Sequence, residues 1–339
     1  MNPFKNKLLP ALRNGGFKME DKMIWCGSVV KGEDNRYHMF ASMWDRSLGF
    51  DANWLYNCKI VRASSDKACG PYQFEEIVLD RRGREYFDGL NVHNPYIQKY
   101  NGKYYLYYMG TTFGGEIPCN DQSRERFIEV WNNKRIGLAV ADSIFGPWKR
   151  CNNPILTPRD YRFWDCTATT NPAVTILEDG TTYMLYKSRT YANSALQIGV
   201  AKADKPDGEF KRISDDPILR FNNPSLHVED PFLWHQDGLF HLVIKDDFKD
   251  NSGGITGEWG AGLYATSKDC INWTIDKDPK VYSRKVKWDD GSVTTQPNLE
   301  RPFLLIEDGR PTHFFFATGE GEGPYRLSHS YNICIPLDV

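Results

Sequence analysis

Residues 94 to 107 read Asn94-Pro95-Tyr96-Ile97-Gln98-Lys99-Tyr100-Asn101-Gly102-Lys103-Tyr104-Tyr105-Leu106-Tyr107. Apolar and aromatic residues flank Asn101-Gly102, the dipeptide that two-residue hairpin turns prefer. The stretch therefore predicts a β-hairpin whose first strand starts at a residue followed by proline.

The same pattern recurs along the chain. Copies begin at Asn171-Pro172, Asp230-Pro231 and Arg301-Pro302, and each runs through an Asp-Gly turn into a second apolar strand. A degenerate copy begins at Gly27, so that copies start about every 70 residues. An Ala-containing strand that ends in Asp follows in four copies, with a ragged fourth strand behind it. Each unit therefore supplies about four strands.

Five such units cannot each bury a face alone, but radial packing buries their faces against one another. The pattern predicts an all-β fold, a five-bladed β-propeller. We expect residues 19–339 to form one propeller domain and residues 1–18 to be an N-terminal extension or a ring-closing strand. A pair of β-sandwiches is the alternative, and it does not account for five phased copies.

Composition limits the partners of this chain of 339 residues. Lys and Arg number 42 and Asp and Glu 44, a formal charge of −2, so the charge predicts no nucleic-acid partner. No apolar run reaches 18 residues, so no membrane span is expected. The 19 Phe, 18 Tyr and 10 Trp residues suit packed strands or a surface that stacks against sugars.

The N-terminus and the cysteines bear on the compartment. Residues 1–16 contain no apolar core of a secretory signal. The eight cysteines form no C-x-x-C pair and no Cys/His cluster, so no zinc site is predicted. We expect mostly buried free thiols and a cytoplasmic location for the sequence as written, or a periplasmic or secreted one if a signal was removed.

The start of each innermost strand is where functional side chains are expected, because these positions converge at one mouth of a propeller channel. The repeat places there Cys26-Gly27, His93-Asn94, Thr170-Asn171, Glu229-Asp230 and Glu300-Arg301. His93, Asn94, Asn171 and His227 offer donors and acceptors for hydroxyl groups. Lys187 and Arg189 end a second strand and either line the channel or form rim salt bridges. Trp25 is either a stacking platform or a core residue.

Aspartates also recur six residues before each of three copies. They are Asp21, Asp88 and Asp165, on segments that enter the same face. They are either further channel carboxylates or caps of the approach turns.

Taken together, these motifs resemble the five-bladed furanosidase-type glycoside hydrolases, such as families 43, 32, 62, 68 and 117. The resemblance rests on Ala63-Ser64-Ser65-Asp66 with Gly70-Pro71-Tyr72, on the Gly146-Pro147-Trp148 copy, and on the Asn-Pro or Asp-Pro pairs before hairpins. It covers about Asp21 to Leu337 and implies cleavage of a glycosidic bond in a central funnel. In family 43 it implies a blade-one Asp as general base, a blade-three Asp that tunes it and a blade-four Glu as general acid.

Carried over by position, the resemblance assigns the general acid to Glu229, whereas Gly27 and Asn171 stand where family 43 has aspartates. The displaced carboxylates Asp21 and Asp165 are then the candidates for the base, and Asp230 and Glu300 compete with them. No cofactor is expected, although the resemblance allows a structural calcium ion. An exo-acting glycosidase is the main prediction. A glycoside phosphorylase and a carbohydrate-binding propeller without activity are the alternatives.

Overall fold

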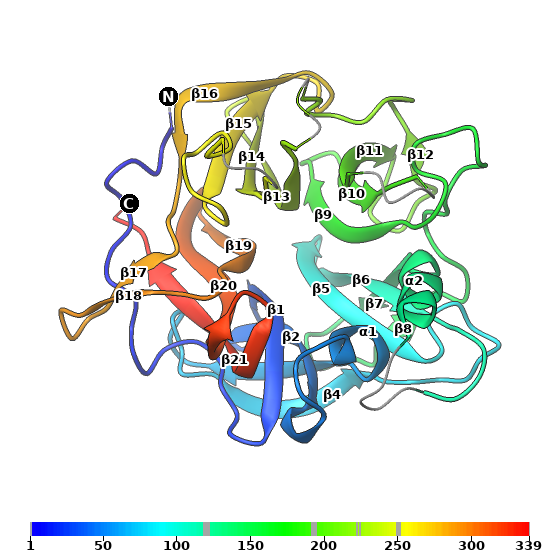
Figure 1. The fold of residues 1–339 in the computed structure, drawn as a ribbon, viewed down its shortest axis with the longest axis horizontal. Helices are drawn as coiled ribbons and strands as arrows, with labels where there is room; N and C mark the ends of the chain where they lie inside the picture. Colours follow the sequence, from blue (N-terminus) through cyan, green and yellow to red (C-terminus); the bar gives the residue numbers. More distant parts are fainter. Residues whose placement is uncertain are drawn as a thin grey trace.

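A computed structural model describes residues 2–117, 123–190, 195–221, 223, 225–248 and 252–338. Five antiparallel sheets stand radially around one axis, with a separate two-stranded hairpin beside the last sheet (Figure 1). The predicted five-bladed β-propeller is confirmed.

Four blades contain four strands each, in chain order from the axis outward, and the fifth contains three. Blades one and two consist of β1 (Lys22–Lys31), β2 (Tyr37–Asp45), β3 (Lys59–Ser65) and β4 (Gln73–Leu79), then β5 (Asn91–Tyr100), β6 (Lys103–Thr111), β7 (Arg135–Ala141) and β8 (Lys149–Arg150). Blades three and four consist of β9 (Thr170–Ile176), β10 (Thr182–Ser188), β11 (Gln197–Ala203) and β12 (Lys211–Arg212), then β13 (Val228–Gln236), β14 (Leu239–Asp246), β15 (Gly262–Ser267) and β16 (Trp273–Lys280). The hairpin and blade five consist of β17 (Lys285–Lys287) and β18 (Val293–Thr295), then β19 (Glu300–Glu307), β20 (Arg310–Gly323) and β21 (Arg326–Pro336).

The hairpin turns follow from their dipeptides. Asn101 and Gly102 both have positive φ, 46° and 74°, and Asp308 and Gly309 have 49° and 74°. Two successive positive φ angles are what a twisted two-residue hairpin requires, and Asn, Asp and Gly tolerate them best. The dipeptide thus marks the same turn in blades two, four and five, whereas Asp179 in blade three has no positive φ and the connection between β9 and β10 is longer.

The N-terminal segment lies against the last blade. Phe17 and Asn332 exchange backbone hydrogen bonds at the free edge of β21, and Leu8 bridges Leu337. Ala11 reaches the β17–β18 hairpin through Lys287. The two ends of the chain therefore meet at blade five, next to blade one.

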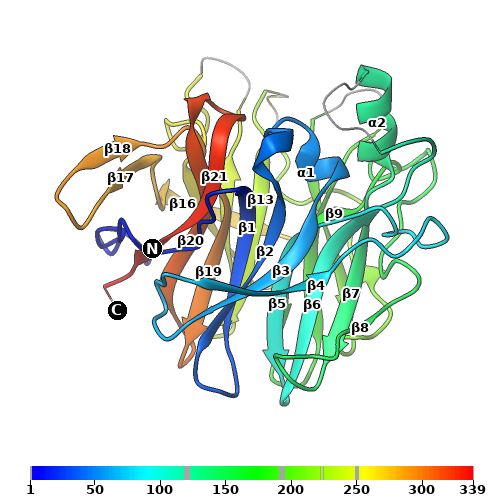
Figure 2. The ribbon, with the colours of Figure 1, turned by 90° about the horizontal axis from the view of Figure 1, so that it is seen from below.

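Two helices rise over one end of the propeller (Figure 2). A 3₁₀ turn (Arg46–Leu48) and α1 (Asn53–Tyr56) follow β2, and α2 (Arg124–Asn132) follows β6. Ser123 caps α2 by accepting a hydrogen bond from the Arg126 N–H. Leu55, Tyr56, Val130 and Trp131 pack in one apolar cluster that holds both helices to the blades.

Among the described residues, no helix has both the length and the apolar character needed to cross a membrane.

The axis of the propeller is sealed by aromatic rings. Tyr96, Phe232 and Phe303 occupy the same position in three blades, two residues after the start of the repeat. Their ring centres lie 5.0 to 5.8 Å apart and all three side chains are buried. The seal divides the channel into two separate mouths.

Candidate functional site

Each innermost strand contains one residue in the left-handed backbone region. The φ angles lie between 52° and 57° at Cys26, Asn94, Asn171, Asp230 and Arg301. The strand register shifts next to each of them, as in a β-bulge. Because this conformation is costly for residues other than Gly, Asn and Asp, its fivefold recurrence marks a position at which the fold turns side chains toward the axis.

These five side chains form an almost continuous hydrogen-bonded ring. The Cys26 thiol donates to Asn94 Oδ1 at 2.9 Å, and Asn94 Nδ2 donates to Asn171 Oδ1 at 2.7 Å. Asn171 Nδ2 donates to Asp230 Oδ1 at 2.6 Å, and Arg301 Nη1 reaches the same oxygen at 3.4 Å. The structure therefore places Cys26, rather than Gly27, at the blade-one position equivalent to the other four.

The ring is the floor of a pocket of about 290 Å³ at the end of the propeller that carries α1 and α2. Its wall comes from the residues that precede the ring positions, from the helices and from the turn between β20 and β21. The lining residues are Trp25, Cys26, Phe50, Asp51, Trp54, His93, Asn94, Phe127, Trp131, Lys134, Asn171, Lys187, Glu229, Asp230, Glu300, Arg301 and Tyr325.

Two glutamates at the bottom of the pocket share one lysine. Lys245 Nζ lies 2.9 Å from Glu229 Oε2 and 2.6 Å from Glu300 Oε2, and its side chain is fully buried. Lys187 makes a second ion pair with Glu229 through Oε1. Glu300 Oε1 accepts hydrogen bonds from the Tyr325 hydroxyl and from Asn298, both at 3.0 Å.

The two glutamates differ in protonation. The ammonium groups of Lys187 and Lys245 hold the pKa of Glu229 well below its usual value, against the effect of burial. Burial, together with the carboxylates of Asp230 and Glu229, raises the pKa of Glu300 to about 7 although Lys245 opposes the shift. Below about pH 7 the pocket thus contains an ionised Glu229 beside a Glu300 that binds a proton more readily.

The geometry does not favour Glu229 as the general acid that the resemblance assigned, because such an acid needs a raised pKa. The sequence does place Glu229 next to Asp230, but the two lysine partners outweigh that repulsion. The raised pKa belongs to Glu300, which has Lys245 as its only ion-pair partner among the described residues.

The same carboxylates are the described group with a spacing suited to a metal ion. One oxygen each of Glu229, Asp230 and Glu300 lie within 4.8 Å of one another. Each carboxylate already has a Lys or Arg nitrogen within ion-pair distance, so protein cations balance their charge. The expectation of a site without a metal or cofactor, with structural calcium open, stays a prediction.

Most residues predicted from the ring positions do line the pocket. They are Trp25, His93, Asn94, Asn171, Lys187, Glu229, Asp230, Glu300 and Arg301. His93 is buried with its ring nitrogens near two thiols, Cys58 at 3.2 Å and Cys26 at 3.9 Å. Burial holds its pKa well below the usual value, so His93 is neutral.

The predicted base Asp21 lies elsewhere. Its side chain is 71% exposed and pairs with Lys22 at 2.9 Å, outside the central pocket. Asp21 directly precedes β1, whereas the bulge that directs side chains inward lies further along the strand, at Cys26. The expectation that it acts in the channel is therefore corrected.

Asp88 and Asp165 are buried between strands and not in the channel. Asp165 is fully buried, pairs with Arg159 and Arg212, and accepts a hydrogen bond from Tyr186 at 2.8 Å. Asp88 has the equivalent set of partners in blade two, namely Arg82, Arg150 and Tyr108. The recurrence of these aspartates reflects a repeated blade buttress, so their predicted roles at the pocket are corrected.

His227 and Arg189 do not line the pocket either. His227 is buried beside Asp247, with Nδ1 3.6 Å from its carboxylate. The Arg189 guanidinium stacks on Trp131 at 3.7 Å from the ring centre, behind the pocket wall. Both were expected at the channel from their sequence neighbours, and both lie just outside it.

The sequence pattern did not predict several wall residues, because they lie in segments outside the repeat. Asp51, Trp54, Trp131 and Lys134 belong to the segments around α1 and α2, and Tyr325 belongs to the last hairpin turn. No periodic signal in the sequence points to these positions. The aromatic residues among them, Trp54, Trp131 and Tyr325, entered the prediction only through the aromatic content of the chain.

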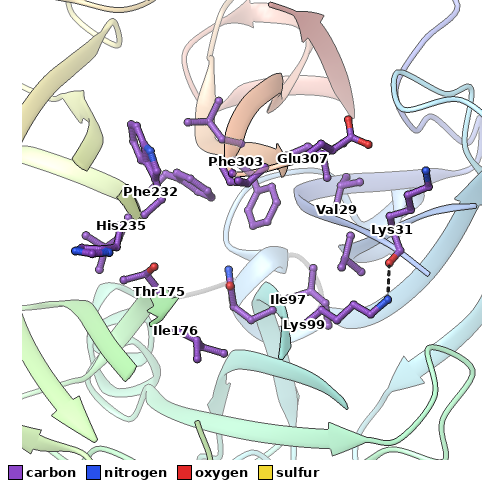
Figure 3. Close-up of a pocket in the computed structure, with 18 of the residues that line it drawn as sticks. Val29, Lys31, Ile97, Lys99, Thr175, Ile176, Phe232, His235, Phe303 and Glu307 are labelled. Carbon is purple, nitrogen blue, oxygen red and sulfur yellow. Dashed lines mark hydrogen bonds between the residues drawn. The ribbon is translucent and has the colours of Figure 1, made fainter. Parts of the chain in front are cut away.

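The opposite mouth is larger, with a volume of about 710 Å³, and its charged side chains, such as Lys31 and Lys99, are exposed (Figure 3). Its walls are the outer halves of the innermost strands, with apolar side chains such as Val29, Ile97, Phe232 and Phe303. Glu307 lies at its edge and is hydrogen-bonded to Tyr37 at 3.0 Å. This mouth is the larger of the two, but the buried carboxylates lie at the smaller one. Acid–base chemistry needs such carboxylates, so the smaller mouth is the candidate functional site.

The described cysteines are free, and all but the half-buried Cys151 are buried. Cys119 lies outside the described residues. The compartment inferred from the cysteines stays a prediction.

No family model matches this chain. It is 28% identical over 197 residues to the extracellular endo-α-(1→5)-L-arabinanase 1 of Bacillus subtilis (strain 168), a match that covers 57% of this chain and 51% of that protein. The chain thus matches about half the length of this curated relative.

Solved glycoside hydrolases share the architecture. A family 117 glycoside hydrolase of the marine bacterium Zobellia galactanivorans superposes with a TM-score of 0.65 at 18% identity, covering 98% of this chain and 90% of that one. An endo-arabinase of Bacteroides thetaiotaomicron VPI-5482 gives a TM-score of 0.60 at 14% identity, covering 96% and 98%. The expected resemblance to five-bladed glycoside hydrolase propellers is confirmed at the level of the fold.

Proposed function

We propose that this chain is a glycoside hydrolase that acts at the smaller mouth of the propeller. The observation that carries the proposal is the pair of glutamates Glu229 and Glu300, which share Lys245 at the bottom of a pocket lined by tryptophan rings. Glycosidic bond cleavage needs one carboxylic acid to protonate the leaving oxygen and one carboxylate to attack or to activate water.

Glu300 is the general acid in this proposal. A catalytic acid works best with a pKa near the working pH, and burial among carboxylates supplies that value at Glu300. Glu229 is the ionised partner, kept so by Lys187 and Lys245. Lys245 contacts both groups and holds them in a fixed geometry.

The spacing favours retention of anomeric configuration. Oxygens of the two glutamates lie within 4.8 Å of each other, near the short separation of double-displacement glycosidases and below that of inverting ones. In that mechanism Glu229 attacks the anomeric carbon, the leaving sugar takes the proton of Glu300, and water activated by Glu300 then releases Glu229. Proton NMR of the first product formed measures its anomeric configuration and so tests the predicted retention.

The pocket shape supports exo action on a terminal sugar. The aromatic seal and the hydrogen-bonded ring close the pocket below, and α1 and α2 raise its wall on one side. A closed pocket fits a chain end better than the middle of a polysaccharide. The curated relative is an endo-acting arabinanase, and this chain is proposed to differ from it in that respect.

The test is a panel of aryl glycosides, including arabinofuranoside, xyloside and galactoside, assayed with and without phosphate. In Glu300→Gln and Glu229→Gln we expect kcat to fall by about 10³-fold or more, while Glu307→Gln at the opposite mouth keeps full activity. Glu300→Gln is expected to keep more activity on nitrophenyl leaving groups, which need no proton. Turnover close to wild type in both pocket variants would remove the hydrolase proposal and favour a carbohydrate-binding propeller.

A further inference from the structure

Lys134 is an unusual cation in the pocket wall. It lies between α2 and β7, is only 2% exposed, and still lines the cavity. Its Nζ lies 3.5 Å from the centre of the Trp131 ring and 5.6 Å from that of Trp54. Within the described part of the chain, no carboxylate lies within ion-pair distance of this nitrogen.

The other pocket cations have acidic partners. Lys187 pairs with Glu229, and Arg301 with Asp230. Lys134 has only the electron-rich faces of two tryptophans, which attract a cation but do not neutralise it. A buried ammonium group without a counter-charge is costly, so a protein retains one where a ligand supplies the charge.

The charges around Lys134 disfavour its ammonium form. Burial, and then the positive charges of Lys187 and Arg189, hold its pKa well below the usual value, although Glu229 and Asp230 oppose the shift. A bound anion would raise this pKa and so favour the ammonium group. Arg189 stacks on the same Trp131 ring, 3.7 Å from its centre. This side of the pocket therefore concentrates positive charge, whereas the carboxylates gather at Glu229, Asp230 and Glu300, and an anion at Lys134 would restore the balance.

Trp131 has a definite part in this arrangement. With two cations within 4 Å of its ring centre, its faces hold the cations and are not free for stacking on a sugar. Trp131 is thus a positioning residue for Lys134.

We propose that the Lys134 ammonium group binds a compact oxyanion of the ligand, either the carboxylate of a uronic acid sugar or a free phosphate ion. For the sugar this inference rests on the proposed function of the pocket and names its preferred substrate class, an acidic glycoside over a neutral one. The Lys134 Nζ lies over the Trp131 ring and near that of Trp54, so the charge is presented at one place in the wall.

The experiment measures binding without turnover, in the full chain carrying Glu300→Gln. Trp54 and Trp131 border the site, so their fluorescence and titration calorimetry both report binding. The probes are sodium galacturonate, sodium glucuronate and sodium phosphate, with galactose and glucose as neutral matches, all at constant ionic strength. We expect at least one anion to bind about 10- to 100-fold more tightly than the neutral sugars, the usual worth of a charged hydrogen bond.

Variants assign that preference to Lys134. Lys134→Met is expected to lose the preference for the anion, whereas Lys134→Arg and the control Lys99→Met at the opposite mouth keep it. Tighter binding of a uronate than of phosphate places the oxyanion on the sugar, and the reverse places it on a free ion. An unchanged preference in Lys134→Met, or no preference for any anion in the parent protein, overturns the proposal.

If Lys134→Met does not fold, the parent protein still tests the proposal, because a parent that prefers no anion over the neutral sugars overturns it. Turnover does not enter this measurement. A parent protein without any anion preference, alongside intact hydrolysis in the unmodified enzyme, refutes only the Lys134 site. Anion binding without any hydrolysis in the unmodified enzyme refutes only the hydrolase.

Discussion

The two mouths of the channel are built from the same five strands, yet only one is suited to catalysis. At the smaller mouth, five bulges turn Cys26, Asn94, Asn171, Asp230 and Arg301 into a polar ring, with paired glutamates directly above it. At the larger mouth the same strands present apolar side chains such as Ile97 and Phe232, together with exposed charged ones such as Lys31 and Lys99. From this difference we infer that the one-residue bulge, repeated around the axis, places the candidate functional site at one end of the propeller, because it turns polar side chains toward the axis there.

The largest expected effect comes from breaking the seal between the mouths. Phe303→Ala removes a buried ring that contacts both Tyr96 and Phe232. A cavity of this kind costs roughly 3–5 kcal/mol of unfolding free energy. Urea denaturation measures the loss, and Ile306→Ala, at a partly exposed site of the same strand, is the control with a smaller expected loss. A loss below about 1 kcal/mol would show that the three rings do not hold the blades together.

The next effect is the pH dependence of turnover. Because Glu300 must be protonated to act as the acid, kcat/KM is expected to fall about tenfold per pH unit above a pKa of about 7. The profile of Glu307→Gln is expected to follow that of the wild type, and the alkaline limb is expected to disappear in Glu300→Gln. An alkaline limb that persists in Glu300→Gln would assign the titrating acid to another group.

A smaller effect concerns stability. The folded protein holds the pKa of Glu300 above the ordinary carboxyl value, so folding is disfavoured once this group must ionise, between about pH 4.5 and pH 7. At pH 8 we expect Glu300→Gln to melt a few degrees above the wild type, and at pH 4 to show no such gain. Calorimetry at both pH values tests this sign, and a variant less stable than the wild type at pH 8 would contradict it.

The smallest effect is expected at the rim. Asp51 comes from blade one, lines the pocket and is exposed. If Glu229 is the nucleophile, Asp51→Asn reduces kcat/KM by less than about tenfold and leaves the product anomer unchanged. A loss of several orders of magnitude together with inversion would make Asp51 the activator of water and displace Glu229 from that role.

The sequence was sufficient for features that repeat and insufficient for those that do not. The hairpin dipeptides predicted five blades, and the ring positions predicted Glu229, Asp230, Glu300 and Arg301 at the pocket, because all of these follow one period. The same reasoning failed at Asp165, since a repeated aspartate is also what a repeated buttress with Tyr186 and Arg212 requires.

Protonation and the loop residues were beyond the reach of the pattern. Which glutamate retains a proton depends on Lys245, which faces Glu229 across β13 and β14, and on Lys187, which reaches Glu229 from the neighbouring blade. Lys134 and Trp131 belong to an insertion found in a single blade, so that no second copy reveals their position. Three-dimensional contacts alone bring these groups to the same pocket.

The most direct test of this account is an infrared titration of the carboxyl groups, which needs no substrate. We expect one protonated carboxyl band that persists to near neutral pH and disappears with a midpoint of about 7. That band is expected to be absent in Glu300→Gln and present in Glu307→Gln. If no carboxyl band titrates above about pH 5.5, or if the band survives in Glu300→Gln, the pair of oppositely protonated glutamates at the smaller mouth does not exist.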